Sequence, residues 1–397
     1  MTHILFVTGE YPPMQGGVGD CTNEIANALA VLGFQVSVLT STASAPGYPV
    51  ASPRNAISVH RIVPRWDWNF LSTLRRILSE SQADIVHIQY QTAAFGMNPA
   101  INLAPRMLKS PDAKFVVTYH DLRVPYLFPK AGPVREWVTY EMARSCDATI
   151  VTNEEDYGRL TGKLRAIPTL IPIGSNIAPS RPSNYDRSAW RARWGIGPSE
   201  TLLAYFGFLN KSKGGETLIR ALAQLPEIKL IMVGASVGAS DPTNSSDWGR
   251  VKRLIAELGL TSRVLWTDYM PAEGVSGSLL AADICVLPYR DGVSFRRGTF
   301  MAALAHGLPI VTTSPPGAVS VSGSSDVSLP RLCDGENVLL VPPDQPEALA
   351  AGIRRLAGDA ALRSQLACGA LELALAFTWD KIAAQHASLY RRLTGTN

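Results

Sequence analysis

The same order of segments occurs in both halves of the chain, and this repetition constrains the fold more than any other sequence feature. In the first half, apolar residues 4–8 lead into a loop rich in glycine and proline, a helical pattern and a second apolar run at 36–39. In the second half, residues 202–205, a glycine loop, a helical pattern at 217–225 and an apolar run at 230–233 repeat that order. Short apolar runs that alternate with helices indicate parallel strands buried on both faces of a sheet.

Further short apolar runs follow in each half, with room for a helix between them. They lie at 85–88, 115–119, 148–152, 264–267, 284–287, 310–313 and 338–341. The interval between the halves is rich in proline and polar residues and has one short helical pattern at 189–194. The sequence therefore predicts an α/β protein with two doubly wound, Rossmann-like domains. Their expected bounds are 1–175 and 199–375, joined by a linker at 176–198 and followed by a final helix within 376–397.

Composition and charge exclude several classes of protein. Hydrophobic residues make up 46% of the chain and charged residues 18%, which suits a globular protein with a large core and not a disordered chain. Lys and Arg (37) nearly balance Asp and Glu (33), and no basic block is present, so no nucleic-acid partner is expected. The five cysteines are far apart and form no C-x-x-C pair, which argues against a disulfide framework or a zinc site and for a reducing compartment.

The sequence also shows no signal peptide, and we expect no stretch of roughly 18 apolar residues that could span a membrane. A cytoplasmic protein is therefore expected, with one face open to peripheral membrane contact.

Three glycine-containing loops lie where an open α/β sheet binds its ligand, between a strand end and the next helix. Such loops and helix starts present backbone N–H groups to phosphate, although glycine there also serves tight turns alone. The candidate nucleotide-sugar-binding residues in and beside these loops are Gly16, Gly17, Gly207, Lys213, Ser294, Arg296, Arg297, Gly298 and Thr299. Two arginines before a helix start suit an anion, but an exposed charged turn is the alternative. The dinucleotide and Walker glycine motifs are incomplete, which disfavours a nicotinamide enzyme.

Several segments together resemble a known family. They are PPMQGGVGDCTNEIANALAVLGFQVSVLT, ADIVHIQY, FVVTYHDLR, KGGETLIRALAQL, ALAHGLPIVTT, DGENVLLVPPDQPEALAAGIRRL and FTWDKIAAQHASLYRRL. Across nearly the whole chain they resemble the retaining glycosyltransferase family 4, which has the GT-B architecture. The resemblance implies two Rossmann-like domains with a cleft between them and a C-terminal helix that crosses back to the first domain. It places the acceptor mainly on the first domain and the nucleotide sugar mainly on the second.

The resemblance also implies an activity. A hexosyltransferase of this type moves a sugar from a nucleoside-diphosphate sugar to an acceptor hydroxyl, with retention of configuration, without a metal and without a further cofactor. UDP is the first expectation for the donor, with GDP or ADP as alternatives, and the acceptor would be a glycan, a lipid-linked molecule or a small molecule. The implied catalytic residues are His120, beside the donor sugar, and Lys213, at the pyrophosphate. A buried structural histidine is the alternative for His120.

Two departures from the family pattern concern the donor site. Phe208 stands where the family's G-R-L motif has arginine, and the two glutamates of its E-x7-E motif are replaced by Ser294 and Ala302. We expect Arg296 or Arg297 to supply the missing cation, with Arg297 favoured because it is nearer the glycine. Two alternatives stay open: a catalytically degenerate GT-B protein that only binds a nucleotide or glycan, and a sugar-nucleotide epimerase. The loops at 43–70 and 121–136 are expected to recognise the acceptor.

Overall fold

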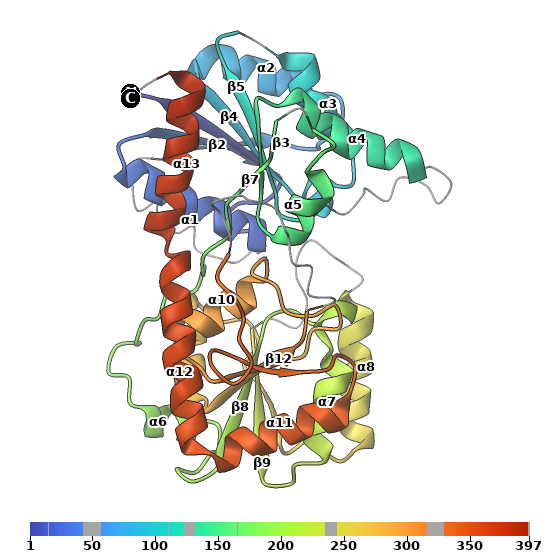
Figure 1. Ribbon diagram of the computed structural model, residues 1–397, viewed down its shortest axis with the longest axis vertical. Helices are drawn as coiled ribbons and strands as arrows, with labels where there is room; N and C mark the ends of the chain where they lie inside the picture. Colours follow the sequence, from blue (N-terminus) through green and yellow to red (C-terminus); the bar gives the residue numbers. More distant parts are fainter. Residues whose placement is uncertain are drawn as a thin grey trace. The chain divides into compact units, whose positions relative to one another are not determined.

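The chain folds into two compact units (Figure 1). The computed structural model describes residues 1–14, 16–42, 57–109, 111–122, 132–164, 166–234, 244–315 and 329–395. The first unit combines Met1–Gly174 with Trp379–Asn397, and the second comprises Ser175–Ser322 and Ser328–Thr378. Much of the two loops expected to recognise the acceptor, residues 43–56 and 123–131, lies outside the described residues.

The first unit contains a seven-stranded parallel sheet with the strand order β3-β2-β1-β4-β5-β6-β7. Its strands are β1 (His3–Thr8), β2 (Gln35–Ser41), β3 (Ser58–Val63), β4 (Ile85–Tyr90), β5 (Lys114–Tyr119), β6 (Ala148–Val151) and β7 (Thr169–Leu170). Its helices are α1 (Gly17–Val31), α2 (Phe70–Ser81), η1 (Thr92–Phe95), α3 (Ala100–Leu108), α4 (Gly132–Ser145), α5 (Glu154–Leu160) and α13 (Trp379–Thr394). Every residue of β1 and β4 is buried, as the continuous apolar runs predicted.

Helix α13 completes the core of the first unit, although it is last in sequence. Its residues Ile382, Ala387 and Tyr390 are buried in one cluster with Ile25 and Leu29 of α1. Each large apolar side chain buried in this way contributes about 1.5–3 kcal/mol. The predicted C-terminal helix is therefore present, and it is part of the first unit.

The second unit contains a six-stranded parallel sheet with the strand order β10-β9-β8-β11-β12-β13. Its strands are β8 (Thr201–Phe206), β9 (Ile228–Val233), β10 (Val264–Trp266), β11 (Ile284–Leu287), β12 (Ile310–Thr313) and β13 (Leu339–Val341). Its helices are α6 (Arg187–Ala192), η2 (Lys211–Lys213), α7 (Gly215–Ala223), α8 (Asn244–Glu257), α9 (Ala272–Ala281), α10 (Gly298–Ala305), α11 (Pro346–Gly358), α12 (Ala360–Ala374) and η3 (Leu375–Phe377).

The interval expected as a linker packs onto the second unit. The backbone N–H of Ser180 donates to Ser276 Oγ, 2.9 Å away. Arg191 of α6, whose side chain is 2% exposed, forms an ion pair with Asp283, with Nη1 and Oδ2 3.0 Å apart. These contacts fix the start of the second unit to helix α9 and to the strand that follows it.

Both sheets agree with the predicted fold class, and the apolar runs identified in the sequence are strands. Strands β3 and β7 were not predicted from the sequence. The edge strand β3 is largely half-buried and includes His60 and Arg61, so it lacks a continuous apolar run, and β7 has only two residues.

One helical stretch, Ala360–Thr394, contains a window of 18 residues with a mean hydropathy of 1.2, which is long and apolar enough for a membrane span. This differs from the sequence expectation, because several alanines raise the mean hydropathy. The stretch includes η3, and α12 packs on α10 of the second unit while α13 packs on α1 of the first. We therefore assign it to the two folded units.

Candidate functional site

Two of the predicted phosphate-binding cations meet at one aromatic ring in the second unit. Lys213 is the last residue of η2, after β8, and Arg297 directly precedes α10. Lys213 Nζ lies 5.1 Å from the centre of the Tyr289 ring, and Arg297 Cζ lies 4.5 Å from the same point. Two residues 84 positions apart in sequence, 297 − 213, are thereby brought to one place at the carboxyl ends of β8 and β11.

Close packing between the two loops fixes this arrangement. The backbone N–H of Arg290 donates to the Ser212 carbonyl oxygen, 2.9 Å away. Gly214 has a φ of 68°, and a Cβ atom there would lie 1.8 Å from the Pro288 carbonyl oxygen. Only glycine allows the loop after β8 to approach the loop after β11 this closely.

Thr299 connects the ring to the lysine. The Tyr289 hydroxyl lies 2.6 Å from Thr299 Oγ1, and Lys213 Nζ donates to the same oxygen over 3.4 Å. The methyl group of Thr299 lies against Gly207, where a Cβ atom would come within 2.5 Å of Thr299 Cγ2. Gly207, with a φ of 114°, therefore leaves room for the start of α10.

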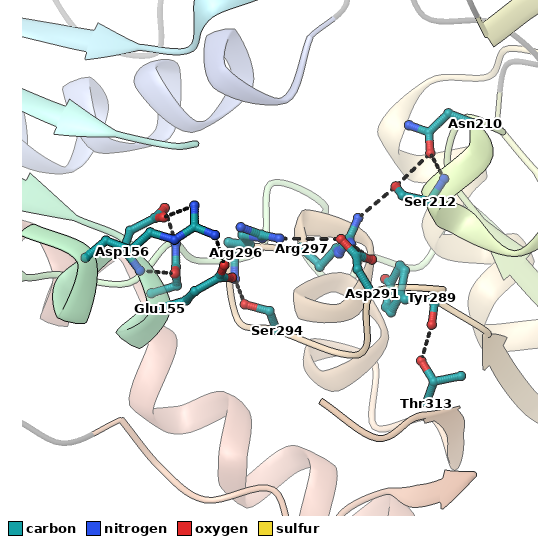
Figure 2. A network of polar contacts seen from close by, with 12 residues as sticks. Glu155, Asp156, Asn210, Ser212, Tyr289, Asp291, Ser294, Arg296, Arg297 and Thr313 are labelled. Atoms are coloured by element: carbon teal, nitrogen blue, oxygen red, sulfur yellow. Dashed lines mark hydrogen bonds and ion pairs between the residues drawn. The ribbon is translucent and has the colours of Figure 1, made fainter. Parts of the chain in front are cut away.

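Asp291 is the counter-ion of both arginines. Its Oδ1 atom is paired with Arg297 Nη2, and its Oδ2 atom lies 3.5 Å from Arg296 Nη2. Figure 2 shows Arg297 between Asp291 and Ser212, whose Oγ atom lies 3.5 Å from Arg297 Nη1. The Arg297 side chain is only 10% exposed, and its buried Nε atom has no hydrogen-bond partner among the described residues. Arg297 thus has donor capacity to spare.

The electrostatics of Lys213 reflect the same crowding of cations. Burial, reinforced by the charge of Arg297 and opposed by Asp291, lowers the pKa of Lys213 to about 7. A nearby anion favours the charged form of a lysine. The site is therefore short of negative charge when it is empty of ligand.

The positions where the family has two glutamates and an arginine are occupied by uncharged residues in this chain. Ser294 is half-buried, and its Oγ atom lies 3.5 Å from the backbone N of Arg296. Ala302 is fully buried within α10, and Phe208 is half-buried. Gly298 is the first residue of α10, and a Cβ atom there would make only an ordinary contact, 3.7 Å from Asn176 Oδ1. The N-terminus of α10 thus begins directly after the two arginines.

In the first unit, His120 follows β5 and is held by Gln89. His120 Nε2 lies 2.7 Å from Gln89 Oε1, which can only accept, so Nε2 carries the proton. Burial, with a smaller contribution from His386, lowers the pKa of His120 to about 4, and the imidazole is neutral at pH 7. His120 contributes to a hollow formed by residues of the first unit alone. The lining residues are Cys21, Ile25, Gln89, Thr118, His120, Thr152, Ile171, Pro172, Ile173, Trp379, Ile382 and His386.

A buried polar network lies behind His120. Gln89 Nε2 lies 3.3 Å from Nε2 of His87, which is fully buried. His87 also contacts two hydroxyl groups: its Nδ1 atom lies 2.5 Å from the Tyr390 hydroxyl, and its Nε2 atom lies 2.7 Å from Thr118 Oγ1. Our sequence reasoning did not identify Gln89. The available signal was its position two residues after His87, on the same face of β4.

In the glycine loop between β1 and α1, the Glu10 carboxylate occupies the place at the helix N-terminus where a phosphate was expected. Glu10 is 4% exposed, and its Oε1 atom accepts from the backbone N–H of Val18 at the start of α1, 3.2 Å away. A Cβ atom on Gly16 would lie 2.1 Å from the Glu10 carboxyl carbon, whereas one on Gly17 would meet nothing within 4 Å. The packing of Glu10 explains Gly16 without any ligand, and Gly17 is the glycine with open space.

Within the parts of the chain that the structure describes, no group of three His, Cys, Asp or Glu side chains has the arrangement of a metal site. All five cysteines are free.

Comparison with known families agrees with this division of the chain. Residues 16–171 match the family model described as a glycosyl transferase 4-like domain, and residues 200–359 match the model described as glycosyl transferases group 1. Each match lies in one of the two units. The chain belongs to the group 1 glycosyltransferases.

Curated relatives of this group 1 chain include several D-inositol 3-phosphate glycosyltransferases. The protein from Streptomyces bingchenggensis is 27% identical over 63% of this chain and 54% of its own length. The protein from Xylanimonas cellulosilytica is 25% identical over 96% of this chain and 92% of its own length. In the first of these matches the chain thus spans about half the length of the curated relative.

Solved structures of similar fold confirm the predicted GT-B architecture of this group 1 chain. Sucrose-phosphate synthase from Thermosynechococcus elongatus has a TM-score of 0.77 and 24% identity, with 100% of both chains covered. HepE from Anabaena, in complex with UDP-glucose, has a TM-score of 0.74 and 20% identity, with 99% of this chain and 100% of that chain covered.

Proposed function

We propose that this protein is a glycosyltransferase that moves a sugar from a nucleoside-diphosphate sugar to an acceptor hydroxyl, with retention of configuration and without a metal. The observation that supports it most is the convergence of Lys213 and Arg297 on Tyr289, next to the first residues of α10. Two cations and helix N–H groups at the carboxyl edge of a parallel sheet suit a diphosphate. Membership of the group 1 glycosyltransferases supports the same chemistry.

We assign the donor diphosphate to the second unit. Arg297 takes the place of the family arginine that is replaced by Phe208 in this chain. Its guanidinium lies over the same ring as Lys213, and its buried Nε donor has no hydrogen-bond partner among the described residues. Arg296 is the weaker candidate, because its Nη2 atom lies 3.5 Å from Asp291 Oδ2, a longer contact than the one that Arg297 makes with the same carboxylate. UDP is the first nucleotide to test, since HepE has been solved with UDP and with UDP-glucose. GDP and ADP are the alternatives.

In the proposed reaction the bond between the sugar C1 atom and the β-phosphate oxygen breaks, and its electron pair leaves with the nucleoside diphosphate. The acceptor oxygen forms the new bond to C1 on the same face, and the acceptor proton leaves to the departing diphosphate. Lys213, Arg297 and the N–H groups of Gly298 and Thr299 stabilise the charge that develops on the leaving group. Asp291 is paired with both arginines, so we assign it no covalent role.

We keep His120 as the candidate for contact with the donor sugar. Its neutral imidazole has one proton fixed on Nε2 by Gln89, which leaves the Nδ1 lone pair available as an acceptor. The acceptor substrate would bind mainly to the first unit. A phosphorylated small molecule is the first acceptor class to test, because the relatives are named D-inositol 3-phosphate glycosyltransferases and sucrose-phosphate synthase.

The absence of carboxylates at Ser294 and Ala302 favours one alternative, a protein that binds a nucleotide sugar without transferring it. A thermal-shift screen against nucleoside diphosphates and nucleotide sugars, followed by mass spectrometry of reactions with a panel of acceptors, separates the two. A ligand at 100 times its Kd raises stability by about 2.7 kcal/mol. Binding with no new glycoside for any acceptor would favour the binding protein. Conversion of the donor into an isomeric nucleotide sugar without any acceptor, detected by NMR because the isomer has the same mass, would indicate an epimerase.

Activity that is lost with EDTA and restored by a divalent ion would contradict the metal-free part of the proposal. NMR of the anomeric proton of the product decides between retention and inversion.

A further inference from the structure

Tyr289 lies between the residues proposed to bind the donor diphosphate, Lys213 and Arg297. The family resemblance did not single out this tyrosine. Its side chain is fully buried. It follows β11 by two residues, and its carbonyl oxygen accepts from the Thr313 hydroxyl (Figure 2). The ring is therefore anchored by the sheet on one side, and on the other it faces both Lys213 and Arg297.

Two like charges at one place repel each other, and something must hold them together when no phosphate is present. Asp291 is paired with Arg297, and its negative charge also favours the protonated form of Lys213, but a carboxylate competes with a phosphate for both cations. The π face of an aromatic ring attracts a cation without adding a formal negative charge. Such a face would stabilise both cations without competing with a phosphate for them.

We propose that Tyr289 is a positioning residue that holds Lys213 and Arg297 side by side, so that the site selects ligands with two adjacent phosphates over ligands with one. This inference rests on the proposed function. A diphosphate contacts both cations at once, whereas a monophosphate needs only one of them. Thr299 supports the arrangement, because its hydroxyl bonds to both the Tyr289 hydroxyl and Lys213.

The test compares UDP with UMP by calorimetry at about pH 7, where the terminal phosphate of both, with a second pKa near 6, is largely ionised and Lys213 is still substantially protonated. In Tyr289→Leu we expect UDP affinity to fall about tenfold and UMP affinity to change by less than about threefold. Tyr289→Phe keeps the ring and loses the bond to Thr299, so its loss of UDP affinity should be smaller. Tyr185→Leu is the matched control, because Tyr185 lies against Trp190 and donates to Gly277 O, away from these loops.

A series of fluorinated phenylalanines at position 289 keeps the shape of the ring and withdraws electron density from its face, which covers the case in which Tyr289→Leu fails to fold. UDP affinity should fall with each added fluorine, while UMP affinity stays level. Equal losses for UDP and UMP, or no loss along the series, would overturn the role of Tyr289 and leave the proposed function intact. If the wild-type protein binds none of UDP, GDP and ADP, both proposals are wrong.

Discussion

The Nε2 atom of His120 and the Oε1 atom of Gln89 lie 2.7 Å apart, at the ends of neighbouring strands β5 and β4. This hydrogen bond determines which imidazole nitrogen carries the proton, and it leaves Nδ1 as the acceptor. We expect the Nδ1 atom, with its lone pair free, to accept a hydrogen bond from the substrate during the reaction.

Replacing Gln89 should therefore affect turnover more than binding. In Gln89→Leu the His120 proton loses its acceptor, and we expect kcat to fall about tenfold or more, the equivalent of about 1.4 kcal/mol, with little change in donor KM. Initial-rate kinetics with saturating acceptor measure both constants. An unchanged kcat would show that the hydrogen bond is only structural.

Gln89→Glu makes the opposite electrostatic change. A carboxylate at this distance favours the charged imidazole, so it should raise the pKa of His120 from about 4 toward neutrality. Loss of the neutral form then begins at a higher pH, and the acid limb of the kcat profile should move upward. NMR titration of the histidine ring protons in wild type and variant measures the pKa directly. A limb that stays in place while the pKa rises would exclude His120 from the rate-limiting step.

Donor binding should depend on pH through Lys213. Its pKa in the free protein is about 7, and a bound diphosphate favours the charged form and raises that pKa. Binding above pH 7 therefore takes up a proton, and affinity should fall as pH rises, by up to tenfold for each pH unit. UDP-glucose is the suitable probe, because its diphosphate does not titrate between about pH 6 and pH 9. Lys213→Met should bind more weakly and lose the pH dependence, and a slope that persists in this variant would assign the proton to another group.

The two arginines should differ in their effect. Arg297→Ala removes a buried cation that shares the Tyr289 ring with Lys213, and we expect nucleoside diphosphate affinity to fall by more than about tenfold, or 1.4 kcal/mol. Arg296→Ala should have a smaller effect, because Arg296 contacts Asp291 more weakly. Calorimetry with UDP measures both. If neither variant weakens binding tenfold, the compensation for Phe208 is wrong, and the exposed Lys211 becomes the next candidate.

Gly16 and Gly17 form a matched pair for the first loop. Gly16→Ala places a methyl group against the buried Glu10 carboxylate, and we expect a loss of about 1–3 kcal/mol in the free energy of unfolding. Gly17→Ala meets no neighbouring atom and should leave stability within about 0.5 kcal/mol. Urea unfolding measures both. A loss of donor affinity in Gly17→Ala at unchanged stability would support the predicted phosphate contact, whereas unchanged affinity would remove Gly17 from the site.

Much of the fold could be predicted, because buried parallel strands need continuous apolar runs that are visible in the sequence. Runs such as 4–8, 115–119 and 284–287 became β1, β5 and β11. The half-exposed edge strand β3 carried no such signal. Loops with glycine and cations at strand ends also made Lys213 and Arg297 candidates for one site, because a parallel sheet brings its strand ends to one edge.

The positions of Tyr289, Gln89 and Glu10 could not be predicted in the same way. Each is an ordinary residue in its local segment, and its role arises from a partner that is distant in sequence: Lys213 for Tyr289, His120 for Gln89, and the start of α1 for Glu10. The sequence by itself determined the strands with continuous apolar runs, the order of those strands along the chain and the loops that carry charge, because these follow from local periodicity. Only the tertiary structure decided which cations share a ring and which glycine accommodates a carboxylate, because such contacts depend on how loops from different strands pack at distances of a few ångströms.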